Sequence, residues 1–123
     1  DLFLPLQNLE FHANNIYITA NLPYIKNGDF ENMSSETIKF EPEQALYWWE
    51  QTGFELYEKL IDQIWVFHKK NSRKNIYLYI EIWFDQSEYC QYYLDKKSLR
   101  YRIEKDNSWI DRCVEIQWKG LNL

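Results

Sequence analysis

One row of side chains offers the clearest chemistry in the sequence. Residues 76–85 alternate between apolar and polar side chains, which predicts a β-strand with one apolar face. The other face of this strand carries a carboxylate among aromatic rings: Tyr77, Tyr79, Glu81 and Trp83. Such a carboxylate can act as an acid or base or bind a cationic group, and part-exposed Tyr and Trp are frequent at protein-binding surfaces. We take the row as the candidate binding site, with an exposed sheet face that binds nothing and a catalytic pocket as the alternatives.

Trp48 is a further candidate binding residue. It stands beside Trp49 in a segment with helical periodicity, where adjacent side chains point about 100° apart. Trp49 fits the inward apolar stripe and Trp48 does not. Trp48 therefore either contacts a partner or packs under the loop that precedes the helix.

The remaining reactive residues form no catalytic or metal-binding motif. His12 and His68 are interpreted as surface residues, and Cys90 and Cys113 stand outside any spacing typical of zinc ligands. We expect both cysteines on strands, and a disulfide between them requires that those strands be neighbours. The three glycines are too far apart for a phosphate-binding loop. We accordingly expect no catalytic residue, no metal and no cofactor.

The patterning at the beginning of the chain predicts a β-hairpin. Residues 9–13 and 16–20 each alternate with a period of two, on either side of Asn14-Asn15. Asn tolerates the positive φ of tight turns, so a two-residue turn is expected there. This gives two antiparallel strands at the N-terminus.

A long amphipathic helix is predicted to follow. Glu41-Pro42 is typical of a helix start, and apolar residues then recur every three or four positions up to Lys70. Gly inside a helix costs about 1 kcal/mol relative to Ala. The helix is therefore either kinked at Thr52-Gly53 or divided there into two helices.

The rest of the chain predicts an antiparallel meander of about four strands. The connections are short, and successive strands with short connections run antiparallel. The expected strands cover residues 76–85, 89–94, 99–104 and 113–118. The fold class is α+β, with the helix packed on the apolar face of the sheet; a cystatin-like or NTF2-like arrangement would satisfy the same pattern.

Composition limits the class of protein. With 123 residues, 46% hydrophobic and 19% aromatic, the chain is expected to form a single domain over residues 1–123. A net charge of −5 argues against nucleic acid or an anionic membrane as a partner. No residues resemble a secretory signal or a membrane span, so a cytoplasmic location is expected. The chain starts with Asp1 rather than Met, which leaves open whether it has been processed.

Two functions from different classes fit these observations. We favour a non-enzymatic, acidic interaction module, such as an inhibitor, an immunity-type antagonist or an accessory subunit, that binds a protein partner through its aromatic face. The alternative is a small-molecule-binding protein or an enzyme, with an aromatic pocket between helix and sheet in which Glu81 or a histidine does acid-base work. An exposed sheet edge would favour a homodimer.

Overall fold

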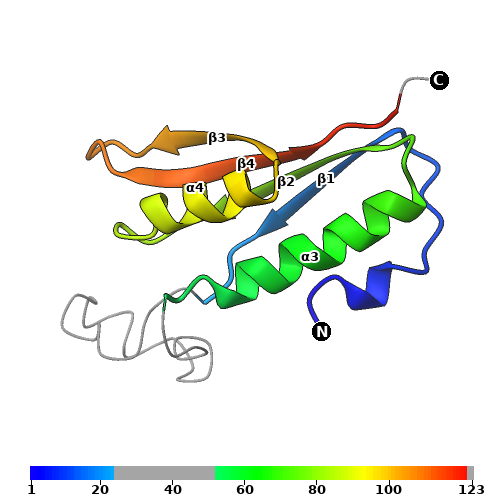
Figure 1. The fold of residues 1–123 in the computed structure, drawn as a ribbon, viewed down its shortest axis with the longest axis horizontal. Coiled ribbons are helices and arrows are strands. Elements are labelled where there is room, and N and C mark those ends of the chain that lie inside the picture. Colours follow the sequence, from blue (N-terminus) through cyan, green and yellow to red (C-terminus); the bar gives the residue numbers. More distant parts are fainter. Residues whose placement is uncertain (24–51, 122–123) are drawn as a thin grey trace.

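The computed structural model describes residues 1–23 and 52–121, which form a four-stranded sheet with two α-helices on one face (Figure 1). The strand order is β1-β2-β4-β3. A 3-10 turn (η1) precedes the first strand. The bounds of the elements are η1 Leu4–Leu6, β1 Asn15–Ala20, α3 Glu55–Lys70, β2 Asn75–Glu81, α4 Ser87–Lys96, β3 Arg100–Lys105 and β4 Asp111–Trp118.

The sheet is mixed, so the prediction of a purely antiparallel sheet is wrong. β1 and β2 run parallel, with Ile16 opposite Ile76 and Ala20 opposite Ile80. β4 then pairs antiparallel with both β2 and β3. A parallel pair needs a long crossover connection, and α3 lies within the segment that joins β1 to β2.

The predicted N-terminal hairpin is also wrong. Residues 9–14 form no strand, and β1 begins only at Asn15. The chain before β1 instead packs on α3: the ring of Phe11 meets the ring of Phe67 edge-on at 5.6 Å, and the backbone N–H of Phe3 donates to Gln63 Oε1 at 2.8 Å. Lys74 Nζ also donates to the carbonyls of Phe11 and Ala13. These contacts take the place of the backbone pairing that a hairpin would provide.

The described helix α3 starts after the predicted weak point. Gly53 has a φ of 74°, so no continuous helix passes through it, and α3 begins at Glu55. The predicted helical residues 41–51, which include Trp48, lie outside the described residues. From Glu55 to Lys70 the predicted amphipathic helix is confirmed, with one buried face made mainly of large apolar side chains.

Residues predicted as the second strand of the meander form α4 instead. Cys90, Tyr93 and Leu94 are buried while Gln91 and Tyr92 are exposed, which is a helical spacing of three and four. Both cysteines are free, with Cys90 buried in α4. Cys113 is exposed on β4, and the two form no disulfide.

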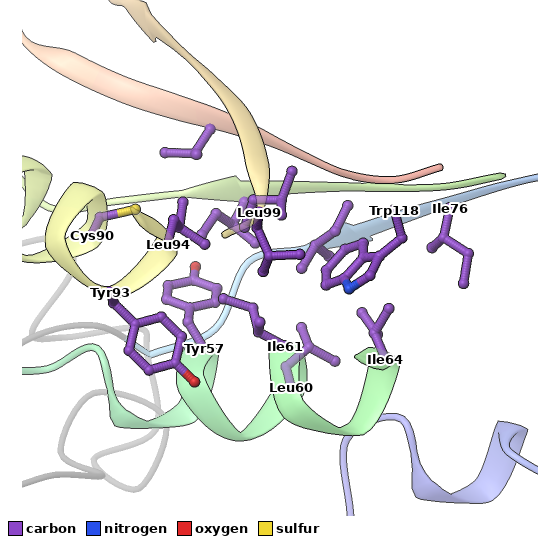
Figure 2. Close-up of a cluster of buried hydrophobic side chains, with 14 of the residues drawn as sticks. Tyr57, Leu60, Ile61, Ile64, Ile76, Cys90, Tyr93, Leu94, Leu99 and Trp118 are labelled. Atoms are coloured by element: carbon purple, nitrogen blue, oxygen red, sulfur yellow. The ribbon is translucent and has the colours of Figure 1, made fainter. Parts of the chain in front are cut away.

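The core lies between the two helices and one face of the sheet (Figure 2). Ile61 and Ile64 of α3 are fully buried, as are Leu78 of β2, Ile116 of β4 and Leu94 of α4. The apolar face predicted for residues 76–85 is therefore confirmed as far as Ile82, but not for Phe84, which follows the end of β2 and is exposed. Within the residues that the structure describes, no helix is both long enough and apolar enough to cross a bilayer.

Candidate functional site at the carboxyl ends of two parallel strands

The parallel pair places two loops side by side at one edge of the sheet. β1 and β2 end in register, and the chain continues as Asn21–Pro23 after β1 and as residues 82–86 after β2. In open sheets with parallel strands, ligands bind in the crevice outside the carboxyl ends of the strands. This edge is therefore the first place in the molecule to look for a site.

Tyr57 joins the two strand ends from below. Its ring is fully buried and rises from α3 toward the sheet (Figure 2). The Tyr57 hydroxyl accepts a hydrogen bond from the backbone N–H of Leu22 at 3.1 Å and donates one to the carbonyl of Glu81 at 2.7 Å. One hydroxyl thus sets the distance between the loop after β1 and the end of β2.

Gln86 holds the loop after β2 in place. Only 2% of its surface is exposed. Its Oε1 accepts from the backbone N–H of Trp83 at 2.9 Å, and its Nε2 donates to the carbonyl of Thr52 at 3.0 Å. A buried amide satisfied on both sides fixes the loop against the segment that leads into α3.

An open hollow of about 390 Å³ lies at this edge on the outer side of the sheet. Asn21 lines it and is exposed, and its side-chain amide has no hydrogen-bond partner among residues 1–23 and 52–121. The hollow is also lined by Tyr79, Glu81, Arg112 and Cys113. It thus combines a carboxylate, a guanidinium, a phenol and a primary amide.

Arg112 connects the hollow to the neighbouring hairpin. Its Nη1 donates to the carbonyl of Ile82 at 3.2 Å, and its Nε donates to Asp106 Oδ2 at 3.3 Å. The guanidinium also lies 5.9 Å from the centre of the Trp83 ring. Arg112 therefore ties the end of β2 to the turn between β3 and β4.

The structure brings only two residues of the predicted row, Tyr79 and Glu81, to the hollow. Tyr79 and Glu81 line the hollow, while Tyr77 lies further from this edge and stacks on Tyr17 with the ring centres 4.9 Å apart. Trp83 does not belong to the row, because β2 ends at Glu81 and Trp83 lies in the loop that follows. The fifth predicted residue, Trp48, lies outside the described residues.

The carboxylate of Glu115 shapes the electrostatics beside the hollow. Glu115 raises the pKa of Tyr79 through a hydrogen bond to its hydroxyl. Arg102 Nη2 lies 3.7 Å from Glu115 Oε2. Across the described residues, no group of three or more His, Cys, Asp or Glu side chains is placed to hold a metal ion.

Sequence reasoning missed Asn21, Tyr57, Gln86 and Arg112. A signal existed for Asn21, which is the first polar residue after the alternating stretch that ends at Ala20 and stands two positions before Pro23. No comparable signal marks Tyr57 or Gln86. Both roles depend on at least one contact with a residue 24 or more positions away in the chain.

Comparison with known proteins gives three informative relatives. The chain is 33% identical over 106 residues to a bifunctional methyltransferase of Rickettsia typhi, covering 85% of this chain and 20% of that protein. It is 30% identical over 120 residues to a release factor glutamine methyltransferase of Staphylococcus aureus, covering 96% of this chain and 41% of that protein. A protein of the same name from Aquifex aeolicus is 29% identical over 115 residues, covering 94% of this chain and 37% of that protein. No protein-family model matches.

The chain thus spans between about a fifth and two fifths of the length of these relatives. All three relatives carry the names of enzymes, which overturns the prediction of a non-enzymatic interaction module. That prediction rested on the absence of any recognised catalytic motif. The absence of a sequence motif is weak evidence against an enzyme when the parts of the site come from separate strand ends.

Proposed function

We propose that this chain forms the acceptor-binding part of a methyltransferase that modifies the side-chain amide of glutamine in a protein. Two of the relatives are named as glutamine methyltransferases. The observation that carries the proposal is the exposed Asn21 amide at the carboxyl end of β1, beside a hollow of about 390 Å³.

A primary amide is the natural partner of another primary amide. Each offers one carbonyl acceptor and two N–H donors, so Asn21 Oδ1 can accept from the glutamine N–H while Asn21 Nδ2 donates to the glutamine carbonyl. This pairing fixes both the position and the direction of the acceptor nitrogen. Holding the acceptor in one geometry contributes to catalysis because it removes the entropy of alignment from the barrier.

The reaction also needs a destination for a proton. When the amide nitrogen forms its bond to the methyl carbon, it must lose one of its two protons. Glu81 lines the same hollow as Asn21, and a carboxylate there is suited to accept that proton. Tyr57 bonds the backbone of Leu22, which directly follows Asn21, and the backbone of Glu81 itself. It therefore positions both proposed participants.

The methyl group comes from an activated donor that the enzyme binds. The described glycines are Gly53 and Gly120, and neither lines the hollow. We assign none of the described residues to the donor. The proposal therefore concerns the acceptor side of the reaction alone.

A methylation assay tests the proposal. The purified protein is incubated with an unmethylated release factor and methyl-labelled S-adenosylmethionine, and the factor is then digested and analysed by mass spectrometry. We expect one added methyl group on a glutamine, and a loss of about 100-fold in kcat/KM for Asn21→Ala because the acceptor is no longer aligned.

Asn14→Ala is the matched control. Asn14 is an exposed residue of the same type just before the opposite end of β1, so its substitution should leave the rate unchanged. Because the proposal assigns only the acceptor side to this chain, a wild-type protein that neither transfers the methyl group nor binds the unmethylated release factor would overturn it. Equal rates for the wild type and Asn21→Ala would remove Asn21 from it.

A further inference from the structure

Trp109 is held in an unusual state on the surface. It lies in the turn between β3 and β4, and 82% of its surface is exposed. Its φ is 62°, in the left-handed region that bulky residues rarely adopt. No ring contact or cation-π contact of Trp109 occurs within residues 1–23 and 52–121.

The turn that carries Trp109 is rigid. Asp106 Oδ1 accepts from the backbone N–H of Ser108 at 2.8 Å and of Ile110 at 3.1 Å. The backbone N–H of Trp109 donates to the carbonyl of Asp106 at 3.0 Å, and the N–H of Asp106 donates to the carbonyl of Ile110 at 2.8 Å. The ring is therefore presented by a fixed backbone, and little ordering entropy remains to be lost when a partner binds.

These hydrogen bonds hold the backbone of Trp109, but its exposed ring gains no burial in return for the strain. A non-glycine residue at positive φ costs on the order of 1 kcal/mol or more, and such strain tends to persist where it serves binding. The Trp109 ring is absent from the core cluster that unites the helices and the sheet. Exposed Trp in a preorganised position is typical of the residues that dominate protein interfaces.

The turn lies on the same edge as the proposed acceptor site. Figure 1 shows the β3–β4 hairpin, in orange, ending at the side toward which the β1 arrow points. Arg112 links the two places, since it binds both Asp106 and the carbonyl of Ile82. With strands about 4.8 Å apart, the turn lies two to three spacings to the side of the end of β1. Trp109 also lies four residues beyond Cys113, which pairs with Glu81, so the straight distance from Asn21 to Trp109 is roughly 15–20 Å.

An open hollow adjoins the ring. It measures about 530 Å³ and is lined by Ile103, Glu104, Lys105, Asp106, Asn107 and Trp109. An extended peptide advances about 3.4 Å per residue, so about four to six residues span the distance from the acceptor site to Trp109 and its hollow. Two relatives are named for a protein substrate, the release factor, and a protein substrate brings such flanking residues with it.

We propose that Trp109 and its hollow bind the substrate polypeptide about four to six residues from the acceptor glutamine, by packing an apolar side chain of that segment on the indole ring. This inference rests on the proposed function, because it places the glutamine at Asn21. It assigns the recognition of the protein substrate to a part of the fold separate from the residues that align the amide.

Binding measurements test the inference without any methyl transfer. Isothermal titration compares the unmethylated release factor, a long peptide with eight residues on each side of the glutamine, and a short peptide with two. We expect Trp109→Ala to weaken binding of the factor and of the long peptide by at least about 10-fold, and to leave the short peptide unaffected. Leu121→Ala, an exposed apolar residue beyond the opposite end of β4, is the control and should bind like the wild type.

Trp109→Gly separates recognition from folding. Glycine adopts positive φ freely, so this variant should melt at or above the temperature of the wild type while binding as weakly as Trp109→Ala. Wild-type affinity in both variants, or equal weakening for the short peptide, would overturn the inference, as would a wild-type protein that binds neither the factor nor the long peptide. Binding that is weakened in Trp109→Ala but unchanged in Asn21→Ala would instead uphold the inference for the docking surface and reject the proposed acceptor site at Asn21.

Discussion

At the scale of single residues, Tyr57 links two strand ends that are far apart in the sequence, at Leu22 and Glu81. Its hydroxyl bonds the two strand ends, while its ring belongs to the core. The residue therefore contributes to stability and to the geometry of the site through different atoms. Substitutions that remove only the hydroxyl can separate the two contributions.

Tyr57→Phe should lower stability modestly and activity more strongly. The ring keeps its packing, but the N–H of Leu22 and the carbonyl of Glu81 lose their shared partner, at a cost of about 1–3 kcal/mol in the free energy of unfolding. Because both strand ends then gain freedom, we expect kcat/KM for the proposed methyl transfer to fall by about 10-fold or more. Urea denaturation and the methylation assay measure the two effects.

Tyr93→Phe is the matched control for this prediction. The Tyr93 hydroxyl donates to Asp62 Oδ1 at 3.2 Å and to the main-chain carbonyl of Glu58 at 3.3 Å, so it joins α4 to α3 and bonds neither strand end. Its loss should reduce stability by a similar amount and leave kcat/KM unchanged. Equal loss of activity in both variants would mean that the hydroxyl of Tyr57 acts only through stability.

At the scale of elements, the β3–β4 hairpin depends on the charge of Asp106. The backbone N–H of Ile110, followed by that of Ser108 and the guanidinium of Arg112, holds the pKa of Asp106 below its usual range. A carboxyl whose pKa is lower in the folded state stabilises the fold above its unfolded pKa, and this contribution is lost as pH falls through the folded pKa. The turn should therefore stay ordered at pH 5 and loosen only below about pH 4.

Nuclear magnetic resonance can follow this titration directly. In the wild type, the amide signals of Ser108 and Ile110 should shift together with a midpoint below about pH 4. In Asp106→Asn, which keeps the acceptor but has no charge to titrate, the step should vanish. A midpoint at or above the ordinary value for Asp would contradict the prediction.

The elements also show how far sequence patterns carry. The alternation over residues 76–82 and the helical stripe over 55–70 were sufficient, because each element buries one continuous face in the core. Residues 89–94 were misread as a strand, since their aromatic content favours β structure, while the buried Cys90, Tyr93 and Leu94 have helical spacing. The direction of β1 could not be read locally, because it depends on which strand lies beside it.

The site was harder to predict than the fold. Alternation placed Tyr79 and Glu81 on the outer face, and both line the hollow. The position of Asn21 beside them follows only from the parallel pairing of β1 and β2, which brings together residues 60 positions apart. Whether the row of residues binds a ligand stays a prediction.

At the scale of the whole molecule, one core joins every described layer. Buried side chains of α3, α4 and all four strands form or pack against a single cluster, and β4 lies between β2 and β3 in the sheet. The outer edges of β1 and β3 have no strand partner among the described residues, so the homodimer through a sheet edge also stays a prediction. A single core implies that the helices and the sheet lose their structure together.

Ile116→Ala tests this cooperativity from the centre of the sheet. Ile116 is fully buried on β4, opposite Leu78 of β2 and Tyr101 of β3. The truncation should lower the free energy of unfolding by about 2–5 kcal/mol, a large part of the total of about 5–15 kcal/mol that is typical of a domain. Cys113→Ala, on an exposed position of the same strand, should change stability by less than about 0.5 kcal/mol. Urea denaturation followed by far-ultraviolet circular dichroism reports mainly the helices, and tryptophan fluorescence reports side-chain packing. We expect Ile116→Ala to lower the midpoint by the same amount with both probes; two separate transitions would show that the chain does not fold as the single domain expected from its size.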